Sequence, residues 1–223
     1  MTSMKFEAIL FDCDGVLVDS EPLTNQVLRE MLAEAGWSMT QAECMAYFVG
    51  KTVREERAEI EARTGKPLTQ DWLNSFYQRR NQALMAHLTV IPGARSAVQA
   101  AHDATQGRIA CASGADRFKV EMQLGKVDLL GFFEGRIFSG HEMPRSKPAP
   151  DVYLAAAAHL NVPGQQCLVI EDTTVGVTAG VAAGATVWAY SPQASADAAL
   201  LQAGARQLFR SMADVPGLLL ASP

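Results

Sequence analysis

Six short runs of apolar residues recur along the chain, and each is almost continuously apolar instead of alternating with polar residues. This pattern is typical of strands that helices cover on both faces, because a strand with one face in water alternates. Segments with a helical pattern separate most of the runs. The order predicts an α/β fold with a doubly wound parallel sheet. The predicted strands begin at Phe6, Arg108, Arg136, Cys167, Thr186 and Gln207, and the predicted helices between them span residues 93–103, 116–125, 150–160 and 175–184.

The interval between the first two predicted strands breaks this rhythm. Ser20 fits an N-cap and Pro22 fits the first turn of a helix. No convincing strand follows, whereas helical patterns occur at residues 22–35, 40–47, 52–63 and 69–87. We therefore expect a helical domain at residues 20–87, inserted after the first strand of an α/β core formed by residues 1–19 and 88–223.

Charge and cysteine usage exclude two kinds of site. The chain of 223 residues has a net charge of −5. This is the wrong sign for nonspecific binding to phosphate backbones, so we expect no nucleic-acid partner. The four cysteines show no C-x-x-C spacing. We expect reduced thiols in the core instead of disulfides or a zinc site.

The apolar stretches of the chain also bear on its cellular localisation. The first apolar run is too short for the apolar part of a signal peptide, so we expect a cytoplasmic protein. Residues 173–196 carry no charge and are long enough to span a bilayer. We interpret them as a helix on the sheet followed by the strand at Thr186, with Gly184 as the break between the two. We therefore expect no membrane partner.

Polar residues follow the predicted strands at the end where an open parallel sheet binds its ligands. They are Asp12 and Asp14 after the first strand, Ser113 and Gly114 after the second, Lys147 after the third, and Glu171 and Asp172 after the fourth. Carboxylates gathered this closely repel one another, so a cation must offset them. Oxygen ligands suit a hard ion such as Mg²⁺. A metal ion, a lysine and a serine are the groups that phosphoryl transfer requires, which makes this the predicted chemistry.

Four segments carry these residues: FDCDGVLVDSE from Phe11, ASG from Ala112, RSKPAPDVY from Arg145 and VIEDTTVGVTAGVAAG from Val169. In residues, order and approximate spacing they resemble the four motifs of the haloacid dehalogenase superfamily of phosphotransferases. The resemblance covers essentially the whole chain. It implies a Rossmann-like catalytic core and identifies the helical insertion with the α-helical cap of one subgroup. Two aspartates in the first motif argue against the metal-independent dehalogenases of the superfamily.

The resemblance also implies roles for the motif residues. Asp12 is expected to attack phosphorus and become an aspartyl-phosphate. Asp14 is expected to protonate the leaving alcohol and then to deprotonate the attacking water. Ser113, Lys147 and the amide of Gly114 are expected to hold the phosphate. The expected Mg²⁺ ligands are the Asp12 carboxylate, the Asp14 backbone carbonyl, and Asp172 with Glu171 beside it.

The expected partner is a small-molecule phosphate ester, bound by a monomer or a weak homodimer. The chain looks most similar to bacterial phosphatases of small phosphorylated sugars or sugar acids, such as 6-phosphogluconate, and phosphoglycolate phosphatase is another relative. Two alternatives to a phosphatase remain. One is a sugar phosphomutase similar to β-phosphoglucomutase, and the other is a non-catalytic binding protein. The mutases carry a His early in the first cap helix and basic residues in a cap loop, where this chain has Thr24, Val49 and Val53. This difference favours hydrolysis, with Lys51 and Arg54 as candidates for binding an anionic group of the substrate.

Overall fold

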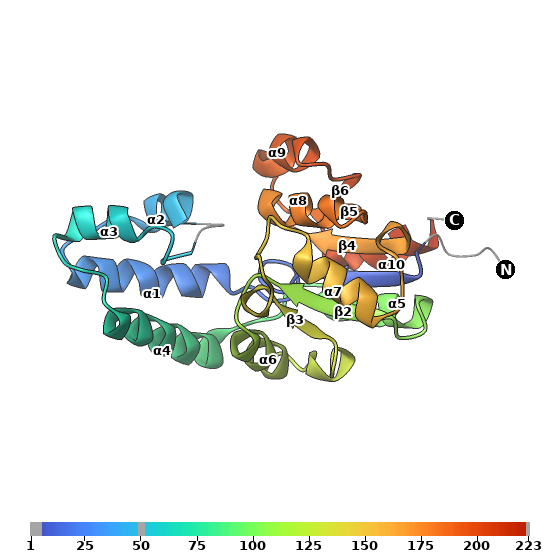
Figure 1. Cartoon of the computed structure of the whole chain (residues 1–223), viewed down its shortest axis with the longest axis horizontal. Helices are drawn as coiled ribbons and strands as arrows, with labels where there is room; N and C mark the ends of the chain where they lie inside the picture. The colour runs from blue at the N-terminus through green and yellow to red at the C-terminus, as the bar shows by residue number, and fades with distance from the viewer. Residues whose placement is uncertain (1–5, 49–51, 222–223) are drawn as a thin grey trace. The chain divides into compact units, whose positions relative to one another are not determined.

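The computed structural model describes residues 6–48 and 52–221. Six parallel strands form one sheet in the order β3-β2-β1-β4-β5-β6 (Figure 1). The strands are β1 (Ala8–Phe11), β2 (Ile109–Ser113), β3 (Ile137–Ser139), β4 (Cys167–Glu171), β5 (Thr186–Tyr190) and β6 (Gln207–Phe209). The predicted α/β fold with a doubly wound parallel sheet is confirmed.

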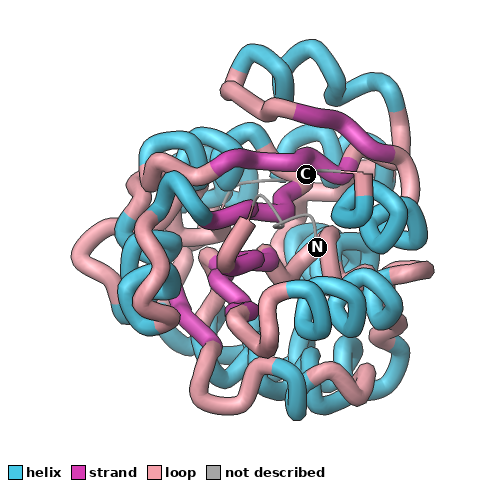
Figure 2. Tube along the Cα trace, turned by 90° about the vertical axis from the view of Figure 1, so that its right-hand side faces the viewer, coloured by secondary structure: helices cyan, strands magenta, loops and turns pink. Residues whose placement is uncertain are grey.

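Helices cover both faces of this sheet, which is why its strands are apolar throughout. In Figure 2 the strands, in magenta, lie between helices, in cyan. On one face, Leu10 and its neighbours pack against α7 (Asp151–His159) and α8 (Thr174–Ala182). The alternate residues of β1 face the other way and are equally buried, and the ring of Phe11 contacts that of Phe133. The remaining helices of this part are α5 (Ala94–Ala104), α6 (Arg117–Lys126), α9 (Asp197–Gln202) and α10 (Val215–Leu220).

The chain divides into two compact units, one formed by Met1–Asp19 with Thr89–Pro223 and the other by Ser20–Leu88. The second unit lies between β1 and β2 in the chain. It contains α1 (Glu21–Glu34), α2 (Gln41–Phe48), α3 (Arg57–Thr64) and α4 (Gln70–His87). Its own apolar core includes Leu32 of α1 and Leu73 of α4, both fully buried. Each unit therefore has the separate core that a domain needs.

Ser20 is the N-cap residue of α1 and Pro22 lies in its first turn, as predicted, although the Ser20 side chain forms no capping hydrogen bond. One local prediction is wrong. The helix predicted at residues 52–63 begins only at Arg57. Before it, Thr52 donates through its backbone and its hydroxyl to Glu55 Oε2, and the Glu55 N–H donates back to Thr52 Oγ1. These reciprocal bonds have the pattern of a capping box, and they close a turn at residues 53–56 directly before the helix.

Helices α9 and α10 were not predicted, because six residues are too few to display a helical period. The uncharged stretch at 173–196 contains α8 and then β5, as predicted. Gly184 lies between them with φ +82°, a conformation that favours glycine. Across the described ranges, no helix has both the length and the apolar character needed to cross a membrane. All four cysteines are free and buried, as expected.

Candidate active site

The strand register brings the motif residues to one edge of the sheet. Phe11 of β1 pairs with Cys111 of β2 and with Ile170 of β4. Asp12, one residue further on, is therefore level with Glu171, and its N–H donates to the Ile170 carbonyl at 3.0 Å. Ser113 ends β2 at the same edge. The carboxyl ends of three neighbouring strands thus carry a carboxylate, a hydroxyl and a second carboxylate.

Lys147 links the carboxylates of β1 and β4. Its Nζ donates to Asp12 Oδ1 at 2.5 Å, to Glu171 Oε1 at 2.7 Å and to the Tyr153 hydroxyl at 2.9 Å. The lysine side chain is only 7% exposed. Burial lowers its pKa, but the two carboxylates outweigh burial and hold the pKa of Lys147 well above its ordinary value. Lys147 is therefore a fixed positive charge in the site.

Glu171 is held by five donors. Its Oε1 accepts from Lys147 Nζ and from the Tyr153 hydroxyl, and its Oε2 accepts from the N–H groups of Asp172 and Thr173 and from Thr173 Oγ1. Burial raises the pKa of Glu171, but Lys147 and these donors bring it below its ordinary value. The side chain is 1% exposed and lies against the first turn of α8, where a Cβ on Gly176 would come 1.7 Å from Oε1. Glycine is thus required for this close approach.

The negative charge of Asp12 is less well compensated than that of Glu171. Burial raises its pKa to about 7, Lys147 opposes this rise, and the charges of Glu171 and Asp14 add to it. The ionised form of Asp12 would therefore be favoured by further positive charge next to it.

Asp12, Glu171 and Asp172 offer carboxylate oxygens that all lie within 4.8 Å of one another. Such a set of oxygen donors suits Mg²⁺. The backbone of Gly15, with φ +78°, lies close to the Asp172 carboxylate, and a Cβ on Gly15 would be 2.1 Å from Asp172 Oδ2. The residues therefore fit a hard cation, and Asp12 and Asp172 fit it best because Glu171 already accepts its five hydrogen bonds.

Asp14 lies in the loop after β1 and has partners of its own. Its Oδ1 accepts from Lys119 Nζ at 2.8 Å and from Gln123 Nε2 at 2.9 Å. Both partners lie on α6, the helix that follows β2. Neither partner was predicted from the sequence.

The other predicted site residues differ in their surroundings. Ser113 is 1% exposed, and its Oγ accepts from the Ala115 N–H at 3.1 Å next to Gly114. In the helical unit, Arg54 donates to the Tyr77 hydroxyl at 3.4 Å and to Gln70 Oε1 at 3.5 Å. Lys51 lies outside the described residues. The structure thus brings together Asp12, Lys147, Glu171 and Asp172, whereas the two hydrogen bonds described for Arg54 go to Tyr77 and Gln70 of the helical unit.

Tyr153, Lys119 and Gln123 are the polar partners that sequence reasoning missed. Tyr153 lies in the alanine-rich stretch DVYLAAAA, where an aromatic residue reads as core. Lys119 and Gln123 are four residues apart, the spacing that places two side chains on one face of a helix. That spacing was the available signal, but it does not tell which face points to the site.

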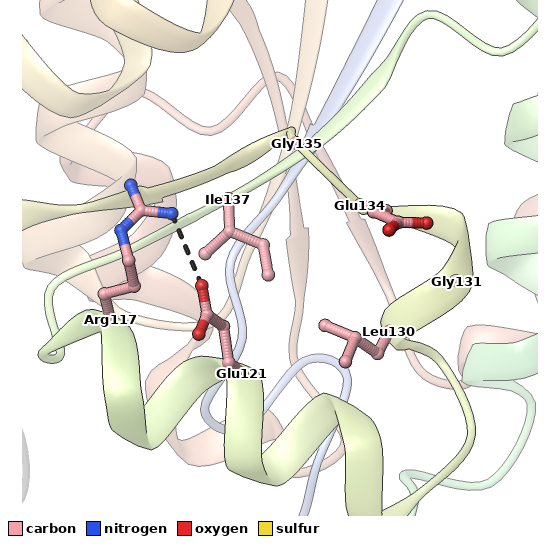
Figure 3. Close-up of a pocket in the computed structure, with 7 residues that line it drawn as sticks. All are labelled: Arg117, Glu121, Leu130, Gly131, Glu134, Gly135 and Ile137. Carbon is pink, nitrogen blue, oxygen red and sulfur yellow. Dashed lines mark ion pairs between the residues drawn. The ribbon is translucent and has the colours of Figure 1, made fainter.

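A cavity of about 340 Å³ lies elsewhere in the α/β unit, between α6, the turn after it and β3 (Figure 3). Figure 3 shows Arg117 directed toward Glu121, with 3.6 Å between Nη1 and Oε1. The cavity is lined by Arg117, Glu121, Leu130, Gly131, Glu134, Gly135 and Ile137. Among the predicted site residues that the structure describes, none lines this cavity.

The chain is similar to a known family of hydrolases in both sequence and structure. The family model of haloacid dehalogenase-like hydrolases matches residues 6–184. The 6-phosphogluconate phosphatase of Escherichia coli is 28% identical over 82% of this chain and 82% of its own length. A haloacid dehalogenase family hydrolase from Deinococcus radiodurans, solved with phosphate and sodium, has a TM-score of 0.81 and 32% identity over 98% of this chain and 97% of its own. A putative β-phosphoglucomutase from Thermotoga maritima has a TM-score of 0.82 over 98% of this chain and 100% of its own, but at 24% identity it supports the fold alone.

Proposed function

This chain belongs to the haloacid dehalogenase-like hydrolase family and is a phosphatase, and we propose that it hydrolyses a small phosphorylated sugar or sugar acid through a phosphorylated Asp12. The observation that carries the proposal is the bridge from Lys147 to both Asp12 and Glu171, with Asp172 beside them. A buried lysine between carboxylates at the ligand-binding edge of a parallel sheet is suited to hold a phosphate dianion next to a nucleophile.

The reaction has two steps. In the first, an Asp12 oxygen forms a bond to phosphorus while the bond from phosphorus to the ester oxygen breaks, and the leaving oxygen takes a proton from Asp14. In the second, a water oxygen bonds to phosphorus, its proton returns to Asp14, and the bond to Asp12 breaks. Lys147, Ser113 and the Gly114 amide hold the phosphate oxygens in both steps. Atoms and charge balance, and Asp14 ends protonated as it began.

We propose that Asp12, Asp14, Asp172 and Glu171 form the surroundings of a Mg²⁺ ion. The carboxylate oxygens of Asp12, Glu171 and Asp172, all within 4.8 Å of one another, support this assignment. The pKa of Asp12 is raised mainly by burial and further by the charges of Glu171 and Asp14, so a cation beside it would favour its ionised form. When bound, the ion supplies positive charge beside the nucleophile and the phosphate.

The substrate class rests on likeness to the Escherichia coli enzyme, which is named for 6-phosphogluconate. Substrate choice in a shared fold resides in side chains that the fold does not fix. We propose that the helical unit, Ser20–Leu88, supplies that choice, with Lys51 and Arg54 favouring an anionic or polyhydroxylated substrate. We also propose a cytoplasmic enzyme, since its four thiols are free and buried. The proposed enzyme is a monomer or weak homodimer.

Phosphate release from a panel of esters tests this function. The panel contains sugar phosphates, sugar-acid phosphates, phosphoglycolate and p-nitrophenyl phosphate, each with Mg²⁺ and with EDTA. We expect turnover that needs the metal and prefers a sugar or sugar-acid ester. Asp12→Asn should reduce kcat by at least about 10³-fold, because the nucleophile is lost.

Two results would contradict the proposal. One is phosphate release that survives Asp12→Asn in folded protein. The other is no release from any ester, and isomerisation of β-glucose 1-phosphate would then indicate a mutase. Charge removal at both Lys51 and Arg54 should alter the order of preferred esters, and an unchanged order would remove these residues from substrate choice.

A further inference from the structure

Helix α6 presents two donors to a single oxygen atom of Asp14. Lys119 Nζ lies 2.8 Å from Asp14 Oδ1, and Gln123 Nε2 lies 2.9 Å from the same atom. The lysine is 8% exposed and the glutamine is fully buried. Burying an ammonium group and an amide costs free energy unless their partners are fixed, so this arrangement needs a reason beyond packing.

The helix that carries the two donors is held in place, and so is the glutamine side chain. Asp116 caps α6, and its Oδ1 accepts from the backbone N–H of Lys119 at 2.9 Å. Gln123 Oε1 accepts from the Cys13 thiol at 3.8 Å, on the residue directly before Asp14. With its oxygen turned to Cys13, the glutamine amide presents its NH₂ group to Asp14. The Asp14 carboxylate is therefore oriented from a helix that lies more than a hundred residues away in the chain.

Two donors at one oxygen fix the orientation of the Asp14 carboxyl group. Its Oδ1 accepts from both Lys119 and Gln123, so the group cannot turn without losing two hydrogen bonds. We propose that Lys119 and Gln123 are positioning residues that hold the Asp14 carboxyl group in the orientation in which it reaches the ester oxygen. This inference rests on the proposed phosphatase function.

The leaving group provides a test that a purely structural role would not pass. The alkoxide leaving from a sugar phosphate is a strong base and needs a proton in the transition state, whereas p-nitrophenolate leaves without one. The specificity constant kcat/KM covers only the steps up to loss of the alcohol, so it reports this proton transfer without the later hydrolysis. The ratio of the two kcat/KM values therefore measures how much proton donation to the leaving group contributes to the rate.

We would measure this ratio for wild type, Lys119→Met and Gln123→Met, with Mg²⁺, using the best sugar phosphate of the panel and p-nitrophenyl phosphate. Lys126→Met is the matched control, since Lys126 is an exposed lysine on the same helix. Gln123→Met retains the Lys119 charge and decides the question if Lys119→Met does not fold. Circular dichroism checks folding of each variant.

For the two test variants we expect kcat/KM for the sugar phosphate to fall about 100-fold and that for p-nitrophenyl phosphate to fall less than about tenfold. The control should match wild type on both esters. An equal fall on both esters, or no fall on either, would overturn the positioning role. Failure of the proposed function is a different result, because wild type would then release phosphate from neither ester.

Discussion

Lys147 shows how single residues set the electrostatics of the site. Its ammonium group is buried, and a buried charge is tolerated only when it is paired and hydrogen-bonded. Asp12 and Glu171 supply the opposite charges, and the Tyr153 hydroxyl accepts from Lys147 while donating to Glu171 Oε1 at 2.8 Å. The tyrosine thus fixes the lysine and the glutamate relative to each other.

Removing that hydroxyl tests this role. Tyr153→Phe leaves Glu171 and Lys147 each short of one buried partner, so the free energy of unfolding should fall by about 1–3 kcal/mol. We also expect kcat/KM for the best ester to fall about tenfold, since a shifted Lys147 misplaces the phosphate. Urea unfolding and steady-state kinetics measure the two effects. Tyr47→Phe is the control, because the Tyr47 hydroxyl also donates to a glutamate, Glu56, at 2.9 Å, but within the helical unit. An equal fall of kcat/KM in the two variants would contradict the role of Tyr153.

At the scale of elements, the junction between β4 and α8 builds the acidic half of the site. Glu171 is the last residue of β4, and the helix begins three residues later at Thr174. Thr173 caps the helix by accepting from the Gly176 N–H at 3.1 Å, and it also donates to Glu171. A carboxylate near the N-terminus of a helix is favoured by the helix dipole. The short junction thus stabilises a buried negative charge.

Gly176→Ala should disrupt this junction. The added Cβ would lie 1.7 Å from Glu171 Oε1, so either the carboxylate or the helix must shift. We expect the free energy of unfolding to fall by about 1–3 kcal/mol and activity to fall with it. Gly217→Ala in α10 is the matched control, because its Cβ meets nothing within 4 Å and alanine should add up to about 1 kcal/mol there. A Gly176→Ala variant as stable and active as this control would show that the close approach does not matter.

At the scale of the whole molecule, the folds of both units could largely be predicted from the sequence. The α/β unit was predictable, because strands covered on both faces read as apolar runs and their register brings Asp12 and Glu171 to one edge. The helices of the second unit were also predictable from their sequence patterns. The exception is the segment with Thr52 and Glu55, which was predicted as helix but forms a turn.

The partners of the site residues were not predictable in the same way. The bonds from Lys119 and Gln123 to Asp14, and from Tyr153 to Lys147, depend on how α6 and α7 are turned against the sheet. Periodicity gives the face of a helix that is buried, but not the polar atom that a side chain on that face will meet. Such contacts are tertiary, and only the folded chain reveals them.

Covalent phosphorylation of Asp12 is the proposed step from which the proposed roles of the site residues follow. It can be observed by quenching the enzyme in acid during turnover of the best ester, reducing it with borohydride and mapping peptides by mass spectrometry. Because reduction converts an aspartyl-phosphate to homoserine, we predict homoserine at position 12 in the wild type and none in Asp12→Asn. An unmodified Asp12 throughout turnover, or reduction at a different carboxylate, would contradict this mechanism.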